Sequence, residues 1–406
     1  MGLDLTSFDS ALKQHYTDDR VENLVYMDNP LLALMPKYES FGGRNLPIPL
    51  IYGNPQGRSA AFATAQTRGA ATSTKLEDFV LTRVKDYSIA TIDNETLESS
   101  KSSSDAFMEA ATTEIDGAIN SLSRSIAVKM YRDGWGDVGV IGSISSNTIT
   151  LSDVETVTNF EVGQQIVVSS SQNAAVLRSG SAIITNVDRD LGTITLDALS
   201  GITGETAGDF IFLAGDRQDS ATPTRQVLSG LGAWIPQTAP SSSAFFTVDR
   251  TVDVSRLGGL RLDASSLPLE EALIEADAKV AREGMALDHF FLSHKRFGEL
   301  KKALGSKVQY VDLQANAKIS FRGILVDGAR GPIKVVPDQN CPNNTCFGLK
   351  LSMWKLYSLG KAVRVIDTDG LSLLRQSSLD GVEARYGMYA QIGCRAPGAN
   401  INIKLA

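Results

Sequence analysis

The stretch of residues 102–133 constrains the fold of this chain more than any other. Its apolar residues recur at steps of three and four, the spacing that gives a helix one apolar face: Phe107, Ala111, Ile115, Ala118, Leu122, Ile126 and Met130. Ser and Asp at its start suit a helix N-cap, and Gly134 follows its last turn. At about 1.5 Å per residue, such a helix spans roughly 46 Å. The pattern predicts one long helix that crosses a whole domain, although a helix of an ordinary bundle would show the same stripe.

The composition is that of a globular chain without a dedicated nucleic-acid or membrane surface. Of 406 residues, 43% are hydrophobic and 21% are charged, which allows a sizeable core in two or three domains. The net charge of −7 argues against a specialised binder of nucleic acids or anionic membranes, whose surface is normally basic. No apolar run suits a membrane span, and the N-terminus lacks a signal-peptide pattern. Three cysteines make no disulfide framework, so we expect folding in a reducing cytoplasm.

The first 92 residues predict an arm followed by a projecting hairpin. Residues 1–41 hold only short apolar runs, and prolines flank the run that contains Leu31 and Leu32, so we expect an arm that lies along another surface. Residues 42–92 contain two extended pieces around a centre, residues 53–74, made almost wholly of Gly, Ala, Ser, Thr, Gln and Arg. This pattern predicts a long hairpin with a mobile polar tip that meets another subunit, since a plain surface loop of this length is unusual.

A change of composition after the long helix predicts an inserted β-module. Residues 93–134 form a lead-in and the helix itself, and residues 135–216 then become rich in Ser, Thr, Val, Ile and Gly. Five or six short strand-like stretches, with a Gly-containing hairpin at residues 186–196, indicate a small all-β barrel or sandwich. We expect this module to be inserted into a host domain.

The remaining chain mixes strands and helices without a regular repeat. Residues 217–265 suggest strands and irregular connections. Residues 266–360 begin with two helical patterns separated by a strand at residues 289–292, and residues 361–406 hold further strands. Because strands and helices do not alternate as in a doubly wound sheet, the predicted fold class is α+β.

The search for catalytic motifs finds no enzyme site. Residues 134–139 match GxGxxG, but they follow a helix and precede a strand, the reverse of a dinucleotide-binding turn, so a flexible exit from the helix explains the glycines. The chain has neither a GxxxxGKS/T nor a GxSxG motif, and no acid and base pair can be named. We therefore expect no catalytic residue, no cofactor and no enzymatic activity.

Two metal-like patterns have plainer explanations. Cys341 and Cys346, together with His289 and His294, could supply four zinc ligands, but the spacing is loose. Plain thiols, Cys394 included, are the expectation, with a zinc site or a disulfide as alternatives. Residues 367–370 (DTDG) suggest calcium, yet the later ligands of an EF-hand loop are absent, and a tight turn between strands accounts for them. We expect no metal site.

Several short segments, in the order given above, resemble one known family. Residues 92–100 (IDNETLESS) before the long helix look like an acidic lead-in to a spine helix, and residues 30–32 (PLL) before the glycines of residues 42–43 look like an N-terminal arm. Three later segments look like elements of an axial domain and its return strands: residues 290–297 (FFLSHKRF), 323–326 (GILV) and 395–399 (RAPGA). The family is the major capsid protein of tailed bacteriophages, the Hong Kong phage-type capsid fold. Only the inserted module falls outside the resemblance.

The resemblance implies a domain plan for the chain. It assigns, in order, an N-terminal arm (1–41), an extended hairpin loop (42–92), the spine helix of a peripheral domain (93–134), the inserted β-module (135–216), peripheral strands and a connection (217–265), an axial domain (266–360) and return strands (361–406). Residues implied to contact a neighbouring subunit are Leu31, Leu32, Arg58, Phe62, Arg68, Lys75 and Phe79. Some relatives crosslink a hairpin lysine to an asparagine. The candidates here are Lys75 and Lys85 with Asn343 and Asn344, but non-covalent contact is the expectation.

The same resemblance implies a function. Copies would assemble as hexamers and pentamers into the icosahedral head of a tailed phage, which encloses double-stranded DNA without recognising its sequence. Portal and scaffolding proteins would be partners, and a decoration protein on the β-module is a further option. The chain would assemble in the bacterial cytoplasm and reside in the virion, with no membrane involved. A cellular nanocompartment shell of the same fold and a glycan-binding or adhesion protein built around the β-module are the alternatives.

Overall fold

A single long helix organises the computed structural model, which describes residues 24–93, 104–197, 201–305, 309–316, 319–367, 373–376 and 380–406. This helix, α6 (Ser104–Tyr131), confirms the prediction made for residues 102–133. The predicted apolar stripe is buried wherever its side chains are described: Ile115, Ala118, Leu122, Ile126 and Met130. The side chains of Phe107 and Ala111 lie outside the described part.

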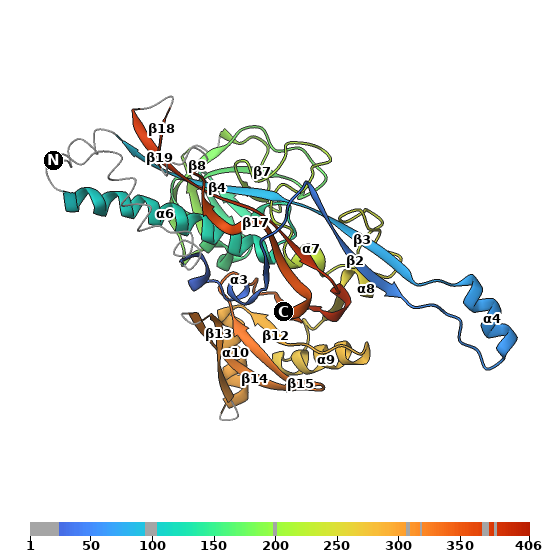
Figure 1. The fold of residues 1–406 in the computed structure, drawn as a ribbon. Coiled ribbons are helices and arrows are strands. Elements are labelled where there is room, and N and C mark those ends of the chain that lie inside the picture. Colours follow the sequence, from blue (N-terminus) through green and yellow to red (C-terminus); the bar gives the residue numbers. More distant parts are fainter. Residues whose placement is uncertain are drawn as a thin grey trace.

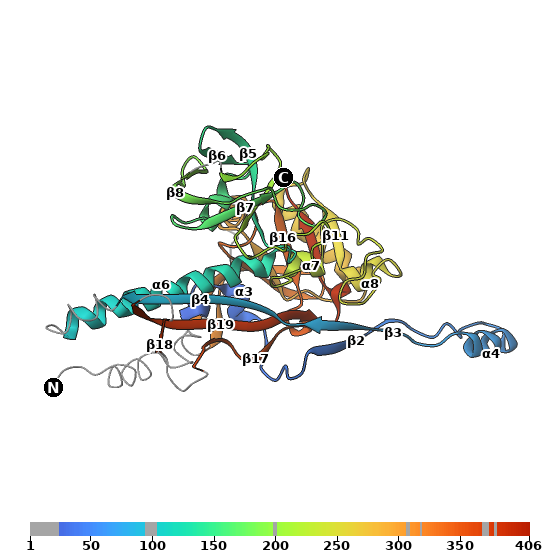
Figure 2. The same ribbon diagram turned by 90° about the horizontal axis from the view of Figure 1, so that it is seen from above.

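A twisted sheet covers one side of α6. Its strands are β1 (Lys37–Tyr38), β4 (Val84–Asp93), β17 (Trp354–Val365), β18 (Leu373–Arg375) and β19 (Gly381–Cys394). The long strand β19 pairs antiparallel with both β4 and β17, so segments almost 300 residues apart in sequence lie side by side. Figure 2 shows α6 stacked on this sheet. The large core between them includes Ala90, Ile92, Ala384 and Met388.

The predicted hairpin projects far from this body (Figure 1). Strands β2 (Asn45–Gly53) and β3 (Lys75–Thr82) pair antiparallel, from Asn45 with Thr82 out to Gly53 with Lys75. Since β4 belongs to the body sheet, the hairpin proper ends near Thr82. The tip is not the mobile polar loop that we predicted, because it contains the helix α4 (Phe62–Ala71). Its Ala, Gln and Arg residues are good helix formers, which accounts for the difference.

The inserted module is a closed barrel rather than a sandwich. Its strands are β5 (Asp137–Ser145), β6 (Thr148–Leu151), β7 (Gln165–Ser169), β8 (Ala182–Asp188), β9 (Thr193–Leu196) and β10 (Phe210–Leu213), closed in the order β10-β5-β6-β9-β8-β7. The short helix η2 (Val154–Asn159) covers one end. Ile149, Phe160, Ile166 and Ile194 fill the interior. The barrel packs on the side of α6 opposite the sheet (Figure 2).

A second sheet, of seven strands, forms the remaining lobe. Its order is β11 (Leu260–Asp263), β20 (Ile401–Lys404), β16 (Thr345–Leu349), β12 (His289–Leu292), β15 (Gly331–Pro337), β14 (Ile319–Gly328) and β13 (Gln309–Asn316). The predicted helices are α9 (Leu269–Arg282), which follows Pro268, and α10 (His294–Leu304), capped by Ser293. The short helices α7 (Leu231–Trp234) and α8 (Val254–Gly258) connect the lobes. The fold is α+β, as predicted.

Some sequence-based boundaries differ from the structure. The chain passes from one sheet to the other within residues 266–360, at η5 (Leu351–Met353), which separates β16 from β17. Strand β11 joins the seven-stranded sheet, although its residues were assigned to the segment before the axial domain. Residues 1–23 of the arm, most of the lead-in at residues 94–100 and the turn at residues 368–370 lie outside the described residues. Among those described, no helix combines the length and apolarity needed to span a bilayer.

Candidate functional site

The tip of the hairpin is highly exposed. No residue of α4 is buried, and the Phe62 side chain is 83% exposed. Between residues 53 and 76 the sequence holds the cations Arg58, Arg68 and Lys75 and no acidic residue. A large exposed aromatic ring on a thin projection has no cover from its own chain. The tip therefore presents an apolar and basic surface to another molecule.

Aromatic side chains hold the base of the hairpin rigidly. Phe79 of β3 is fully buried, with its ring centroid 5.0 Å from that of Trp234 and 6.3 Å from that of Phe245. The backbone N–H of Val80 donates to the carbonyl of Phe246 at 3.0 Å. Such packed aromatic contacts fix the direction in which the hairpin leaves the body.

The turn that grips the hairpin base has strained backbone. Phe246 and Thr247 have φ values of 47° and 76°, in the left-handed region that non-glycine residues rarely adopt. The Thr247 hydroxyl donates to the carbonyl of Asp78 at 3.2 Å, and the turn is closed by backbone bonds between Phe245 and Val248. The surrounding contacts hold this conformation against its intrinsic cost.

The residues predicted to contact a neighbour fall into two groups. Arg58, Phe62, Arg68 and Lys75 are exposed at or near the tip, which suits contact with a second molecule. Leu31, Leu32 and Phe79 are at most 1% exposed and are enclosed by their own chain. These three therefore stabilise the subunit itself.

The described part of the predicted arm packs on the body of its own subunit. Residues 30–34 form the helix α3 (Pro30–Leu34), which was not expected between two prolines. Pro30 stands in the first turn of the helix, where its missing N–H costs nothing. The Asn29 side chain donates to Ser123 of α6 at 2.9 Å and to the Val25 carbonyl at 2.7 Å. Burial and polar contacts together fasten this segment to the spine helix.

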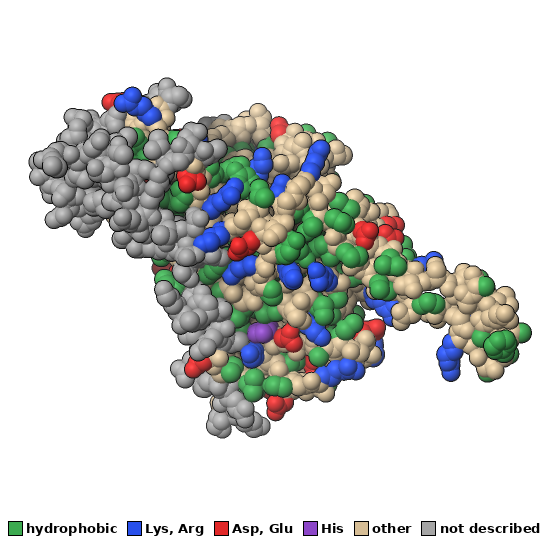
Figure 3. Space-filling model, viewed as in Figure 1, with side chains coloured by type: hydrophobic (Ala, Val, Ile, Leu, Met, Phe, Trp, Pro, Cys, Tyr) green, Lys and Arg blue, Asp and Glu red, His purple; other side chains and the backbone are tan. Residues whose placement is uncertain are grey.

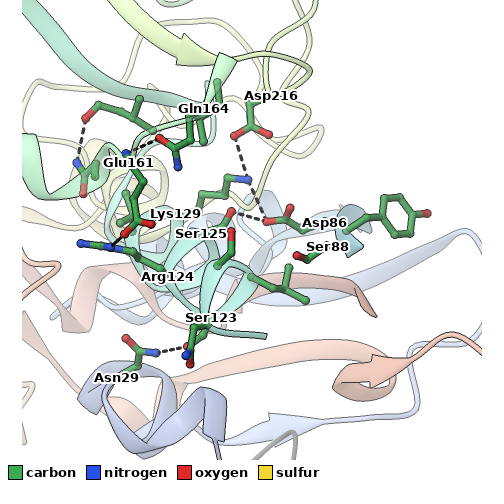
Figure 4. Close-up of a pocket in the computed structure, with 18 of the residues that line it drawn as sticks. Asn29, Asp86, Ser88, Ser123, Arg124, Ser125, Lys129, Glu161, Gln164 and Asp216 are labelled. Atoms are coloured by element: carbon green, nitrogen blue, oxygen red, sulfur yellow. Dashed lines mark hydrogen bonds and ion pairs between the residues drawn. The ribbon is translucent and has the colours of Figure 1, made fainter. Parts of the chain in front are cut away.

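Lys129 joins the helix, the sheet and the barrel at one point (Figure 4). Its Nζ lies 2.9 Å from Asp86 Oδ2 of β4 and 3.1 Å from Asp216 Oδ2, just after the last barrel strand, and its side chain is 7% exposed. Ser125 also donates to Asp86, at 2.8 Å. Burial alone would lower the pKa of Lys129, but attraction by Asp216 and Asp86 outweighs burial and raises it.

A polar pocket of about 630 Å³ surrounds this junction. It lies between α6, β4 and the barrel, and an ion pair between Arg124 of α6 and Glu161 of the barrel crosses it (Figure 4). Gln164 accepts a hydrogen bond from the Glu161 backbone N–H at 2.9 Å and so shapes the same wall. The contacts across this pocket set the orientation of the barrel on the spine helix.

The chain leaves α6 through a crowded glycine turn. Gly134 and Gly136 have φ values of +86° and +91°, and an added Cβ would lie 2.7 Å from the Ser229 hydroxyl and the Asp216 carbonyl respectively. Only glycine fits such backbone at no steric cost. The glycines of the GxGxxG match thus belong to the exit from the helix, as predicted, but they are required by crowding and positive φ and not by the flexibility that we expected.

Two carboxyl groups meet at this exit. Arg132 lies 3.8 Å from Asp137, which is 5% exposed, and Arg225 donates to the backbone carbonyl of Asp133 at 2.9 Å. Burial, followed by repulsion from Asp137, raises the pKa of Asp133 to about 6. The buried carboxyl of Asp133 therefore holds its proton more tightly than a carboxyl exposed to water.

The candidate metal residues do not form a site in the described chain. Cys341, Cys346 and Cys394 are buried free thiols, and burial raises the pKa of all three. Burial, together with repulsion from Lys334, lowers the pKa of His289 to about 4. Within the described ranges, no group of three or more His, Cys, Asp or Glu side chains could hold a metal ion.

No family model matches the chain, and no curated protein matches it. Solved structures are similar to it over more than nine tenths of its length. One is the cyanophage A-1(L) capsid asymmetric unit, with 12% identity, coverage of 93% of this chain and 92% of that chain, and a TM-score of 0.48. The similar structures include both phage capsids and an encapsulin.

The encapsulin is the holo-SrpI complex from Synechococcus elongatus PCC 7942, with 8% identity, coverage of 92% and 86%, and a TM-score of 0.44. The virus-like particle from Pyrococcus furiosus has 8% identity, coverage of 95% and 96%, and a TM-score of 0.42. The chain thus spans nearly the whole length of these proteins. Phage capsids, the class named from the sequence, are represented among them alongside other particles.

Proposed function

We propose that this chain is the subunit of a closed icosahedral shell, and that the shell is the head of a tailed phage around double-stranded DNA. The observation that carries the proposal is the projecting hairpin, whose tip exposes Phe62 and three cations while its base is fixed in an aromatic core. A rigid projection with an uncovered aromatic tip is suited to lie over a neighbouring copy. Closed symmetry then multiplies one modest contact many times.

The rest of the architecture supports a load-bearing role. The spine helix α6 is tied to the arm segment, the body sheet, the barrel and the second sheet through Asn29, Asp86, Asp216 and Asp338. Force applied to the hairpin passes through its aromatic base into this body. A subunit of this kind transmits load between its neighbours without changing its own fold.

A phage head is favoured over a cellular nanocompartment by the added barrel, which enlarges the side of α6 away from the body sheet. Under this proposal the subunits form hexamers and pentamers, with portal and scaffolding proteins as partners and the barrel as the place for a decoration protein. Assembly takes place in the bacterial cytoplasm. Contact between hairpin and neighbour is non-covalent.

The test is electron microscopy and sedimentation of the purified full chain, with and without the scaffold. The variant Phe62→Asp removes the apolar tip where the side chain is 83% exposed, so the subunit should fold normally and fail to assemble. The matched control is Leu191→Asp, at a barrel turn where the side chain is 66% exposed, which should assemble like the unchanged chain. A tip variant that still closes shells contradicts the proposed role of the hairpin.

The cargo decides between the two kinds of shell. Particles that protect double-stranded DNA from nuclease support the phage head. Particles that enclose a protein and no nucleic acid support the nanocompartment. A chain that stays monomeric under every scaffold and salt condition, while the barrel side binds a glycan, supports the adhesion alternative.

A further inference from the structure

The charge of this chain is divided unevenly between the two sides of the spine helix. Residues 135–216, which form the barrel, contain ten acidic residues and two arginines, a net charge of −8. The whole chain carries −7, so everything outside the barrel is slightly positive. The barrel and the body sheet lie on opposite sides of α6 (Figure 2). The barrel is therefore an acidic part of the chain, and the rest of the chain is not acidic overall.

The alternation along β4 shows which side chains point away from α6. Asp86 contacts Lys129 of α6, so even-numbered positions of this strand face the helix. Odd-numbered positions face outward, and Tyr87 and Ile89 there are 50% and 52% exposed. The ring of Tyr87 packs against Tyr389 of β19 at a centroid distance of 5.9 Å, which places Tyr389 on the same outer face.

Cations surround these tyrosines. Arg44, Arg83 and Lys85 line an open pocket of about 580 Å³ with Tyr389, and no acidic side chain is among its lining residues. The guanidinium of Arg364 on β17 lies 5.3 Å from the centre of the Tyr389 ring. We call Arg44, Arg83, Lys85 and Arg364 the basic face. Figure 3 shows Lys and Arg side chains gathered over β4, β17 and the base of the hairpin.

We propose that the basic face binds the phosphate backbone of the enclosed nucleic acid, and that it is therefore the inner surface of the shell. Guanidinium and ammonium groups spaced over an open pocket suit phosphate oxygens, and exposed tyrosine rings tolerate neighbouring sugars and bases. Such contacts do not read sequence. This inference rests on the proposed shell function, because only a closed shell has an enclosed side.

The geometry favours nucleic acid over an acidic surface of a neighbouring copy. The acidic barrel lies on the other side of α6 from the basic face. In a shell one subunit thick, all barrels point to one side and all basic faces to the other, so a barrel cannot reach the basic face of its neighbour. A polyanion held inside the shell can reach the basic face.

The test measures binding of a short fluorescein-labelled DNA duplex to the full chain by anisotropy, as salt is raised. The variant Arg44→Gln/Lys85→Gln/Arg364→Gln removes three cations and keeps Arg83, which donates to the Phe41 carbonyl. Each lost phosphate contact lowers the slope of log affinity against log salt by roughly 0.9, so we expect a loss of about 2.7 in slope. Affinity at low salt should fall at least about tenfold.

The control variant Arg282→Gln/Lys295→Gln/Lys302→Gln makes the same change in net charge on α9 and α10, where all three side chains are exposed. It should leave slope and affinity unchanged, and thermal unfolding should show that both variants fold. Equal losses in the two variants, or no loss in the basic-face variant, would overturn the proposal. So would a basic-face variant that binds DNA normally and fails to assemble, because the face would then contact another copy.

The experiment distinguishes a failure of particle assembly from a failure of DNA binding by the basic face. If the chain binds DNA through the basic face but never forms particles, the shell proposal fails while the surface assignment stands. If particles form, the basic-face variant should protect less nucleic acid from nuclease than the control variant. Equal protection would show that the basic face is not the inner wall.

Discussion

The hydroxyl of Tyr131 donates a hydrogen bond to Oδ2 of Asp338 at 2.8 Å, and both residues are buried. Tyr131 ends the spine helix, while Asp338 follows β15 of the seven-stranded sheet. The same carboxylate accepts hydrogen bonds from the backbone and side chain of Asn340, at 2.9 and 3.2 Å, and from the Leu31 backbone at 3.4 Å. One side chain thus joins the early helix, the spine and the second lobe.

Removing this carboxylate should destabilise the subunit more than removing its phenol partner. Asp338→Ala leaves several buried donors without an acceptor, so we expect a loss of about 3 kcal/mol in the free energy of unfolding. Tyr131→Phe removes one hydrogen bond and should cost about 1 kcal/mol. Urea unfolding of both variants measures the difference. Equal losses would mean that Asp338 is not the joint between the lobes.

Stability should depend on pH through Asp133. Its pKa is raised in the folded chain, so the folded state binds the proton more tightly than the unfolded state. The resulting stabilisation is complete below about pH 4 and is lost as pH rises through about 6, with a total of up to about 3 kcal/mol. Asp133→Asn should remove this decline. A pH profile of thermal unfolding for both proteins measures this decline, with Asp327→Asn, at an exposed position of β14 in the seven-stranded sheet, as the control.

Loss of the Lys129 ammonium should loosen the barrel from the body. Lys129→Met leaves Asp86 and Asp216, whose side chains are 15% and 20% exposed, without their cation, which should cost about 3 kcal/mol. The triple variant Lys129→Met/Asp86→Asn/Asp216→Asn removes all three charges and should recover most of that loss. Guanidinium unfolding measures the energies. Hydrogen exchange should rise first at the barrel junction, and uniform exchange throughout would contradict the prediction.

Two phenylalanines of the hairpin should respond in opposite ways. Phe79→Ala opens a cavity in the aromatic base and should cost about 3 to 5 kcal/mol in the isolated subunit. Phe62→Ala, on the exposed tip, should change that stability by no more than about 0.5 kcal/mol. Thermal unfolding at a concentration too low for assembly makes the comparison. Similar effects of the two substitutions would mean that the tip is packed within its own subunit.

Local patterns in the sequence predict much of the fold. The stripe from Ile115 to Met130 predicts a helix because its spacing recurs over many turns, and the barrel strands are predicted because β-branched residues are frequent there. Ser293 and Gly305 marked the ends of α10. Signals of this kind depend only on residues that are close together in the sequence, so they can be recognised without knowledge of the fold.

Contacts between residues far apart in the sequence are not predicted by such local patterns. Asp86, Lys129 and Asp216 form one junction, yet nothing in the sequence around each residue points to the other two. The basic face likewise depends on the pairing of β19 with both β4 and β17, which places Lys85 and Arg364 on the two strands that flank β19. Leu31 was assigned to a neighbour because a short apolar run cannot show which surface covers it. The sequence does not predict the α4 helix because its small residues suit a loop equally well.

The two ends of the barrel leave the host at the same point. An added Cβ on Gly136, at the entry, would lie 2.7 Å from the carbonyl of Asp216, at the exit. The host chain therefore spans almost no distance where the barrel is inserted. An insertion with touching ends can be lengthened, exchanged or cut away while the spine and the sheets keep their positions. The barrel is therefore a self-contained insertion, and replacing it with another small domain should leave the host fold unchanged.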